Sequence, residues 1–157
     1  MQNITTCLWF DTAGEDAANF YVSLFKNSRI VSVTHYGEAG PREEGLVMTV
    51  SFELDGHEFL ALNGGPEYKF TEAVSFQIMC EGQDEVDFFW DSLADGGEEG
   101  PCGWLKDRYG VSWQVVPTAL PELLGDPDPA RARRAMQAMF GMRKLDIAAL
   151  QRAADQA

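Results

Sequence analysis

The chain has 157 residues, of which 25 are Asp or Glu and 12 are Lys or Arg, so its formal charge is −13 before the two histidines are counted. This charge argues against nucleic acid and membrane surfaces as partners, because phosphates and acidic lipids are bound by clustered basic side chains. With 45% hydrophobic and 24% charged residues, the composition is that of a folded globular domain rather than a disordered or membrane-embedded chain.

Two further features bear on the compartment. No apolar run is long enough to cross a membrane, and the first residues lack the basic and apolar regions of a signal peptide. Cys7, Cys80 and Cys102 are odd in number and far apart, which favours reduced thiols over a disulfide framework. We therefore expect a cytoplasmic protein.

The first half of the chain predicts one strand, one helix and three further strands. An apolar strand at 5–10 precedes a helix from about Gly14, and Asp55-Gly56 is typical of a hairpin turn. The apolar face of this helix consists of Ala17, Phe20, Tyr21 and Leu24. The three later strands are expected at 29–36, 46–54 and 58–62.

The second half repeats this order at an offset of 68 residues. The stretch 14–21 aligns with 82–89, and three of the eight positions are identical. The second copy also follows an apolar strand, at 74–80, and its helix has an apolar face. That face consists of Val86, Phe89, Trp90 and Leu93. Further strands are expected near Glu98 and at 102–106 and 111–116. The matching order of elements indicates a duplication.

The composition changes at Pro117. Residues 1–117 hold 20 acidic and 6 basic side chains, whereas the tail holds 5 and 6. Asp126-Pro127-Asp128-Pro129 is typical of a helix start, Gly141 is a plausible stop, and Asp146 can cap a last short helix. The apolar stripe of the first tail helix consists of Ala132, Ala135, Met136, Met139 and Phe140. We expect this stripe to pack on the body or on a partner subunit.

These elements predict an α+β protein of two βαβββ modules that form a curved mixed sheet around a cleft, with a C-terminal helical extension. The boundaries are 1–70 for the first module, 71–117 for the second and 118–157 for the extension, within one structural domain overall.

Side-chain alternation divides each strand into two faces. The apolar face, expected to pack against the helices, consists of Leu8, Phe10, Met48, Val50, Phe52, Leu54, Leu60, Leu62, Val74, Phe76, Ile78, Val111, Trp113 and Val115. The opposite face consists of Thr5, Cys7, Trp9, Thr49, Ser51, Glu53, Ala61, Asn63, Ser75, Gln77, Ser112 and Gln114. It either lines a cleft suited to a small, partly polar molecule or is the solvated side of an antiparallel sheet.

Several phrases of the sequence resemble a known superfamily. They are Leu8-Trp9-Phe10-Asp11, the stretches 20–28 and 61–66, and above all 102–107 and 110–117. With the βαβββ duplication, they resemble the vicinal oxygen chelate (glyoxalase, bleomycin resistance, dioxygenase) superfamily. The last two stretches resemble its PhnB-like branch, often labelled demethylubiquinone methyltransferase-like. The tail is similar to extensions seen in that branch.

Some members of the superfamily hold a divalent metal ion with His and Glu side chains on inward strand positions, and the resemblance implies where such a site would lie in this chain. Those positions correspond here to Thr5, Ala61, Ala73 and Gln114. None of them is a usual ligand of a catalytic divalent metal, and the amides of Asn63 and Gln114 would make only a weak site for a hard cation. We therefore expect no bound metal and no cofactor.

Other chemistry has weaker support. A Gly-rich strand-to-helix turn for a nucleotide-type methyl donor is missing from the sequence. Cys7 or Cys102 could be a nucleophile only if folding brings His35 or His57 near, and a buried structural thiol is the plainer interpretation. Glu53 could act as a general base if it were desolvated, although an exposed strand-end carboxylate is the alternative.

Two functions from different classes remain. The first is a small-molecule-binding protein whose ligand, an unidentified organic molecule, is held in a neutral polar and aromatic cleft. The side chains expected to hold it are Trp9, Asn63, Gln77, Trp104 and Gln114. The second is an enzyme, either a metal-assisted lyase or dioxygenase or the transferase that the family label implies. The resemblance also implies a homodimer.

Overall fold

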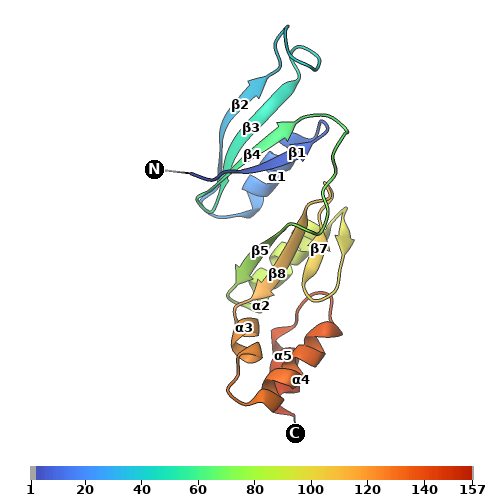
Figure 1. The fold of residues 1–157 in the computed structure, drawn as a ribbon. Coiled ribbons are helices and arrows are strands. Elements are labelled where there is room, and N and C mark those ends of the chain that lie inside the picture. Colours follow the sequence, from blue (N-terminus) through green and yellow to red (C-terminus); the bar gives the residue numbers. More distant parts are fainter. Residues whose placement is uncertain (1–2, 157) are drawn as a thin grey trace. The chain divides into compact units, whose positions relative to one another are not determined.

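The computed structural model describes residues 3–156. Contacts group the chain into two compact units, one ending at Phe70 and the other beginning at Thr71. The first unit contains β1 (Thr6–Phe10), α1 (Gly14–Leu24), β2 (Arg29–His35), β3 (Val47–Leu54) and β4 (His57–Asn63). Its four strands form one mixed sheet in the order β1-β4-β3-β2 (Figure 1), in which β1 and β4 are parallel and the other pairs antiparallel.

The hairpin between β3 and β4 turns at Asp55 and Gly56. Both residues have positive φ, 48° and 80°, as a two-residue turn that matches the twist of the strands requires. The turn predicted from Asp-Gly is therefore confirmed.

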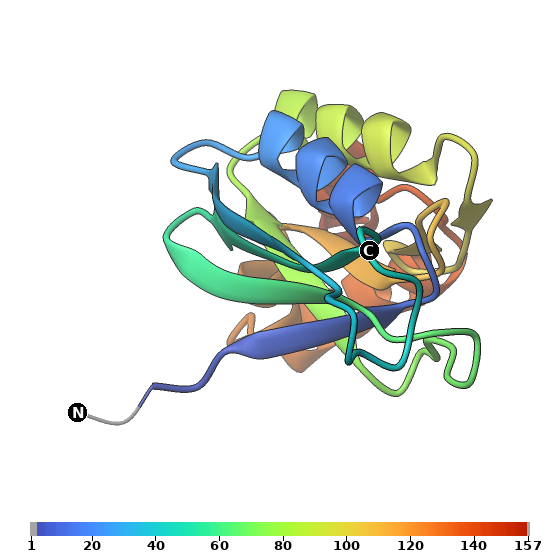
Figure 2. The same ribbon diagram turned by 90° about the horizontal axis from the view of Figure 1, so that it is seen from above.

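Helix α1 lies on one face of the first sheet (Figure 2). Ala17, Ala18 and Tyr21 of the helix are fully buried, and the Tyr21 ring lies beside that of Phe52 on β3. The two alanines allow the helix to approach the sheet, and burial of the large aromatic side chains contributes apolar area that stabilises the packing.

One predicted strand face is wrong. In β4, Ala61 and Asn63 are buried, whereas Leu60 and Leu62 are half-buried on the other face. Helix α1 lies so close at Gly14 that a Cβ there would be 3.3 Å from the Ala61 Cβ. Only small or hydrogen-bonded side chains fit beneath this turn of the helix. The face of β4 that packs against α1 therefore carries Ala61 and Asn63, and the prediction that Leu60 and Leu62 pack there is wrong.

The second unit begins with the repeated module. It contains β5 (Ser75–Cys80), α2 (Gln83–Ala94), β6 (Glu98–Glu99), β7 (Trp104–Lys106) and β8 (Ser112–Pro117). These strands form a mixed sheet in the order β5-β8-β7-β6, with β5 and β8 parallel. The repeated strand–helix–strand order predicted from the 68-residue offset is confirmed, including the short strand at Glu98. Val74, expected on the apolar face, precedes β5 and is exposed.

The core of this module lies between α2 and one face of the sheet. Leu105, Trp113 and Val115 are buried there, as are Val86, Trp90 and Leu93 of the helix. The indole nitrogen of Trp113 donates to the carboxylate of buried Asp107 at 2.9 Å. The helix-facing side of β8 that was predicted from alternation is thus confirmed at Trp113.

Three helices follow the second sheet: α3 (Ala119–Leu124), α4 (Pro129–Phe140) and α5 (Ile147–Asp155). Asp128 caps α4 by accepting from the Ala130 N–H, and Asp146 caps α5 by accepting from the Ala149 N–H, both at 3.0 Å. The predicted caps are confirmed, and α4 ends before Gly141 as expected. The short helix α3 was not predicted.

The extension packs on the second module through a shared core of Val116, Leu120, Leu145 and Leu150. The backbone N–H groups of Cys102 and Gly103 donate to the carbonyls of Met142 and Arg143, each at 2.8 Å. The tail is therefore joined to the sheet by hydrogen bonds as well as by apolar contact, which agrees with the expected packing of the tail on the body.

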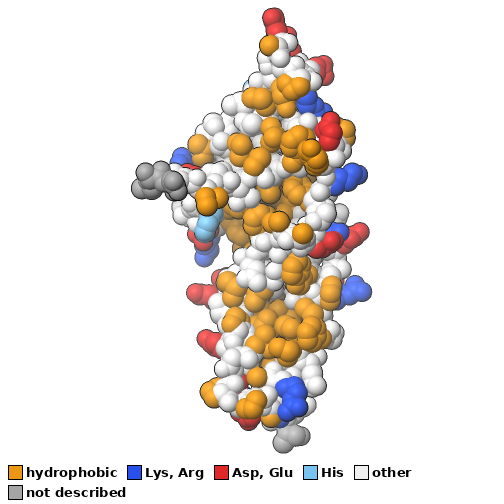
Figure 3. Space-filling model, viewed as in Figure 1, with side chains coloured by type: hydrophobic (Ala, Val, Ile, Leu, Met, Phe, Trp, Pro, Cys, Tyr) orange, Lys and Arg blue, Asp and Glu red, His pale blue; other side chains and the backbone are white. Residues whose placement is uncertain are grey.

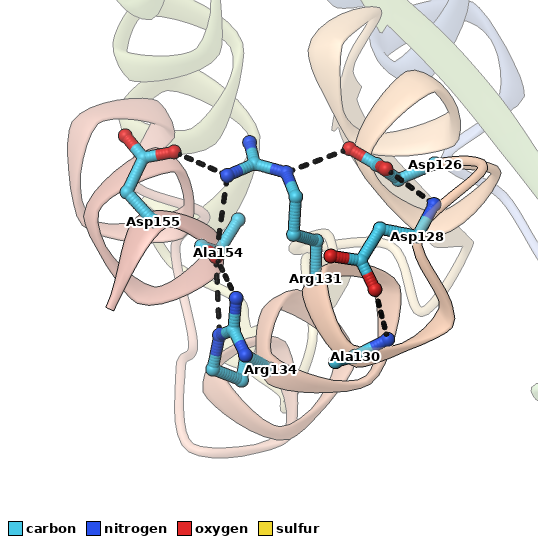
Figure 4. A network of polar contacts seen from close by, with 7 residues as sticks. All are labelled: Asp126, Asp128, Ala130, Arg131, Arg134, Ala154 and Asp155. Carbon is cyan, nitrogen blue, oxygen red and sulfur yellow. Dashed lines mark hydrogen bonds and ion pairs between the residues drawn. The ribbon is translucent and has the colours of Figure 1, made fainter. Parts of the chain in front are cut away.

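An arginine-centred network holds the helices of the extension together (Figure 4). Arg131 on α4 donates to Asp126 at 3.0 Å and to Asp155 on α5 at 2.6 Å. Arg134 donates to the carbonyl of Ala154 at 2.6 Å. Along the stretch 3–156, no helix is long and apolar enough to cross a bilayer.

Candidate ligand pocket

The face of the second sheet that is turned away from α2 presents paired side chains in rows. The register pairs Ser75 with Ser112, Gln77 with Gln114 and Met79 with Val116 across β5 and β8. On the other side of β8, Trp104 pairs with Gln114 and Lys106 with Ser112. Residues in register point to the same side of a sheet, so this face changes along the strands from hydroxyl, through amide, to apolar side chains.

A cavity of about 780 Å³ lies over this face. The strands contribute Gln77, Met79, Trp104, Leu105, Lys106, Ser112, Gln114 and Val116 to its lining. The helices contribute Leu120, Pro121 and Leu124 of α3 and Met139 and Phe140 of α4. Glu72 and the stretch 98–102 complete it. A drug-sized organic molecule fits a cavity of this size.

Apolar side chains gather where the helices meet this sheet, between β5–β8 and α3–α5 (Figure 3). A few polar groups set among apolar walls are the usual make-up of a small-molecule site, because the walls supply area and the polar groups fix orientation.

The amide row is held by hydrogen bonds of its own. The Gln77 Nε2 donates to the Gln114 Oε1 at 3.0 Å, and the Gln114 Nε2 donates to the Ser75 Oγ at 2.9 Å. Each amide nitrogen thereby uses one of its two hydrogens. The amides are oriented before any ligand arrives and retain further hydrogen-bonding capacity.

Ser112 has an unusual environment. Its side chain is almost fully buried, and its Oγ has no hydrogen-bond partner among the residues that the structure describes. A buried hydroxyl without a hydrogen-bond partner lowers the stability of the folded state by about 1–3 kcal/mol. Such groups therefore usually bind another protein group or an ordered water molecule.

The polar end of the pocket is bordered by an ion pair between Lys106 and Glu72. The hydrogen bond to Glu72 raises the pKa of Lys106, with a smaller effect of the nearby Glu98, and the same hydrogen bond lowers the pKa of Glu72. One ammonium between two carboxylates leaves this border with excess negative charge. The lining is thus uncharged along β5 and β8 and acidic at one border, near β6 and Glu72, which was not expected.

The structure brings three of the five sequence-predicted site residues together. Gln77, Trp104 and Gln114 lie on adjacent strands and line the same pocket. Trp9 and Asn63 belong to the first unit. The Trp9 indole donates to the carbonyl of Gly65 at 2.9 Å.

Asn63 uses both ends of its amide within the fold. Its Oδ1 accepts from the Gly14 N–H at 2.8 Å, and its Nδ2 donates to the Val47 carbonyl at 3.0 Å. Helix α1 has no side-chain cap of its own, so Asn63 satisfies one of the free N–H groups at its start.

The helical wall of the pocket was not predicted as part of a site. Met139 and Phe140 were recognised only as part of an apolar helix stripe, and α3 was not recognised. The sequence signal that could have identified this wall is the apolar stripe of the first tail helix. Its last residue, Phe140, is not part of the core shared with the sheet and is 65% exposed.

A catalytic metal does not fit the residues present. The positions implied by the superfamily are Thr5, Ala61, Ala73 and Gln114, which offer one hydroxyl and one amide. Ala61 is buried beneath α1. Within residues 3–156, no group of three or more His, Cys, Asp or Glu side chains is arranged to hold a metal ion.

The other groups considered for catalysis are the carboxylate of Glu53, the two histidines and the cysteines. Glu53 is engaged by Arg29 at 3.1 Å on neighbouring strands. Both histidines belong to the first unit, whereas Cys102 belongs to the second. All three cysteines are free thiols, as expected, and burial raises the pKa of Cys80 to about 12.

Residues 2–116 match the model of the 3-demethylubiquinone-9 3-methyltransferase family. Among solved structures, the chain is 40% identical to the PhnB protein from Bacillus cereus, which carries the same methyltransferase label; the match covers 74% of this chain and all of that one, with a TM-score of 0.67. Among curated proteins, none matches this chain.

Two more distant structures share the fold. Protein PA1353 from Pseudomonas aeruginosa is 17% identical over 74% of this chain and 98% of that one, with a TM-score of 0.62. The fosfomycin resistance protein FosX from Mesorhizobium loti is 11% identical over 80% and 98%, with a TM-score of 0.56. The resemblance to the PhnB-like branch of the vicinal oxygen chelate superfamily, and with it the glyoxalase-like fold, is confirmed.

Proposed function

The chain belongs to the 3-demethylubiquinone-9 3-methyltransferase family, and we propose that it acts as a binding protein for a small, uncharged organic molecule. The observation that carries this proposal is the pocket on the second sheet, with its preoriented amide row of Gln77 and Gln114. The binding needs no metal, because the amides of Gln77 and Gln114 supply the polar contacts.

The chemistry of the lining supports a ligand with a ring and at least one hydroxyl or carbonyl group. Trp104 offers an aromatic surface next to Gln114, and aromatic faces favour flat partners. Anions are disfavoured, because Glu72 and Glu98 outnumber Lys106 at the polar end.

Solution NMR with phenol and 4-ethylphenol as probes tests this function. We expect the side-chain NH₂ resonances of Gln77 and Gln114 and the indole resonance of Trp104 to shift together and saturably. Benzoate is the matched anionic control and should give weaker shifts. If neither phenol moves these resonances at millimolar concentration, the proposal is wrong.

The family name describes a different activity, the transfer of a methyl group to a demethylated quinol. The same pocket has the size and the hydrogen-bonding groups for a phenolic ring, which favours keeping this as a second candidate. The sequence contains no G-x-G-x-x-G turn for a nucleotide-type methyl donor. Incubation with a demethylated quinol and a labelled sulfonium methyl donor distinguishes the two, since only a transferase yields labelled product.

Two further properties belong to this proposal. We propose a homodimer, for which light scattering should give twice the chain mass of 17.4 kDa; a monomeric mass would contradict it. We also propose that the protein works in the cytoplasm, which cell fractionation checks.

A further inference from the structure

The pocket has two walls of different origin. The sheet wall lies within residues 2–116, the range that matches the family model. The helical wall, formed by α3 and the end of α4, lies outside that range. The PhnB protein from Bacillus cereus is matched along its whole length by 74% of this chain.

The two walls also differ in chemistry. On the sheet, the row of Ser75 and Ser112 is four residues from the row of Met79 and Val116, or about 13 Å at about 3.3 Å per residue. Helix α3 begins two residues after β8 ends, and therefore continues from the apolar end. The pocket is polar where β5 and β8 begin and apolar where the extension covers it.

The apolar wall is positioned by contacts that do not depend on a ligand. Leu120 is buried in the core shared with Val116, and Met139 packs against that core. Phe140, at the end of α4, lines the pocket and is nevertheless 65% exposed. A large exposed aromatic side chain beside an apolar cavity offers unused area to a ligand.

We propose that the C-terminal extension determines specificity, with Met139 and Phe140 as the selecting residues. The ligand class is an amphipathic ring compound whose hydroxyl or carbonyl edge meets Gln77 and Gln114 and whose hydrocarbon substituent lies along α3 and α4. This inference rests on the proposed binding function. It adds a hydrocarbon substituent of the ligand, which would contact the helices that lie outside the range matched by the family model.

A series of phenols with growing 4-alkyl groups tests the inference. Phenol, 4-ethylphenol, 4-butylphenol and 4-hexylphenol share one polar head and differ only in hydrocarbon length. Burial of each methylene group should tighten binding about three- to fourfold. In the complex with 4-hexylphenol, we expect nuclear Overhauser contacts from the alkyl chain to the Met139 methyl group and from the ring to the Gln114 amide.

The variants are Phe140→Ser and Met139→Gln, which should flatten the dependence of Kd on chain length. Met136→Ser is the matched control on the same helix, and Phe88→Ser is the control for an exposed phenylalanine; the two controls are 43% and 49% exposed and do not line the pocket. Both should retain the full chain-length dependence. Since Phe140 is exposed, its variant should fold even if the Met139 variant does not, and thermal unfolding checks both.

Two results would overturn the inference, and they can be told apart. If phenol shifts the Gln77 and Gln114 resonances but chain length has the same effect in all variants, the extension does not select the ligand and the binding function stands. If no member of the series shifts these resonances, the binding function fails and the inference fails with it.

Discussion

The side-chain amide of Gln77 donates to the amide oxygen of Gln114 across two parallel strands, at 3.0 Å. Because Gln114 in turn donates to Ser75, the row has one direction, and donors and acceptors alternate along it. Among the described residues, the Oε1 of Gln77 has no hydrogen-bond partner. It is therefore the acceptor best placed for a ligand hydroxyl.

Replacing Gln77 by Leu should weaken the binding of 4-ethylphenol roughly 3- to 10-fold, since a neutral hydrogen bond contributes about 0.5–1.5 kcal/mol. Stability should change little, because Gln77 is exposed in the free protein. Isothermal titration calorimetry measures the affinity. Gln137→Leu, at an exposed position of α4 away from the pocket, is the matched control; equal affinities of both variants would contradict the role of Gln77.

Ser112 and Ser75 give opposite predictions for the same substitution. Ser112→Ala removes a buried hydroxyl that has no partner, so the free protein should become about 1 kcal/mol more stable, whereas Ser75→Ala removes the acceptor of Gln114 and should not stabilise it. Chemical unfolding measures both variants. A loss of stability in Ser112→Ala would show that the hydroxyl has a partner, such as a bound water molecule, in the free protein.

The alternation of apolar residues predicted most strands, the Asp-Pro-Asp-Pro segment predicted the cap of α4, and Asp146 predicted the cap of α5, because these features depend on neighbours in the sequence. The inward face of β4 could not be predicted in this way. Ala61 and Asn63 are buried because α1 comes close at Gly14, and that approach is a property of the folded module.

The candidate site was predictable to a similar extent. Gln77 and Gln114 were selected from the polar parity of their strands, and Trp104 was selected as an aromatic side chain; the strand pairing that places them together comes from the structure. The wall of Met139 and Phe140 does not, because it requires knowing where the extension folds back. A helix stripe indicates that something is covered, but it does not identify the surface that it covers.

Asn63→Ala separates a structural role from a binding role. The substitution leaves the Gly14 N–H and the Val47 carbonyl without their partner in a buried region, which should cost about 2–4 kcal/mol of unfolding free energy. The affinity for 4-ethylphenol should stay within twofold of the wild type, because Asn63 does not line the pocket. An affinity loss of tenfold in folded protein would instead support Asn63 as a ligand contact.

The extension should lose stability in acid through Asp126. The backbone N–H of Asp128 and the guanidinium of Arg131 hold the pKa of Asp126 below its ordinary value of 3.8. A carboxylate with a lowered pKa stabilises the folded state above its ordinary pKa, and this contribution disappears as the pH falls through the lowered value.

Asp126→Asn should therefore lower the Tm at pH 7, and the difference from the wild type should close as the pH falls below 3.8. Thermal unfolding between pH 7 and pH 2.5 measures this difference. Glu122→Gln, at an exposed position of α3, is the control and should show a smaller difference throughout. A difference that stays constant down to pH 2.5 would contradict an ionic role for Asp126.

Cys102 reports on occupancy of the pocket without any substitution. It lines the cavity, whereas Cys7 is exposed in the first unit and Cys80 is fully buried. With iodoacetamide at pH 8, we expect Cys7 and Cys102 to be modified and Cys80 to be unreactive until the protein unfolds, since the thiolate is the reactive form and burial raises the pKa of Cys80 to about 12.

Saturating 4-hexylphenol should slow the modification of Cys102 severalfold and leave the rate at Cys7 unchanged, because only Cys102 borders the bound molecule. Mass spectrometry of the digested protein gives both rates from one sample, with Cys7 as the internal control. Equal slowing at Cys7 and Cys102 would mean that the phenol depletes the reagent or alters the whole protein, and it would contradict occupancy of this pocket.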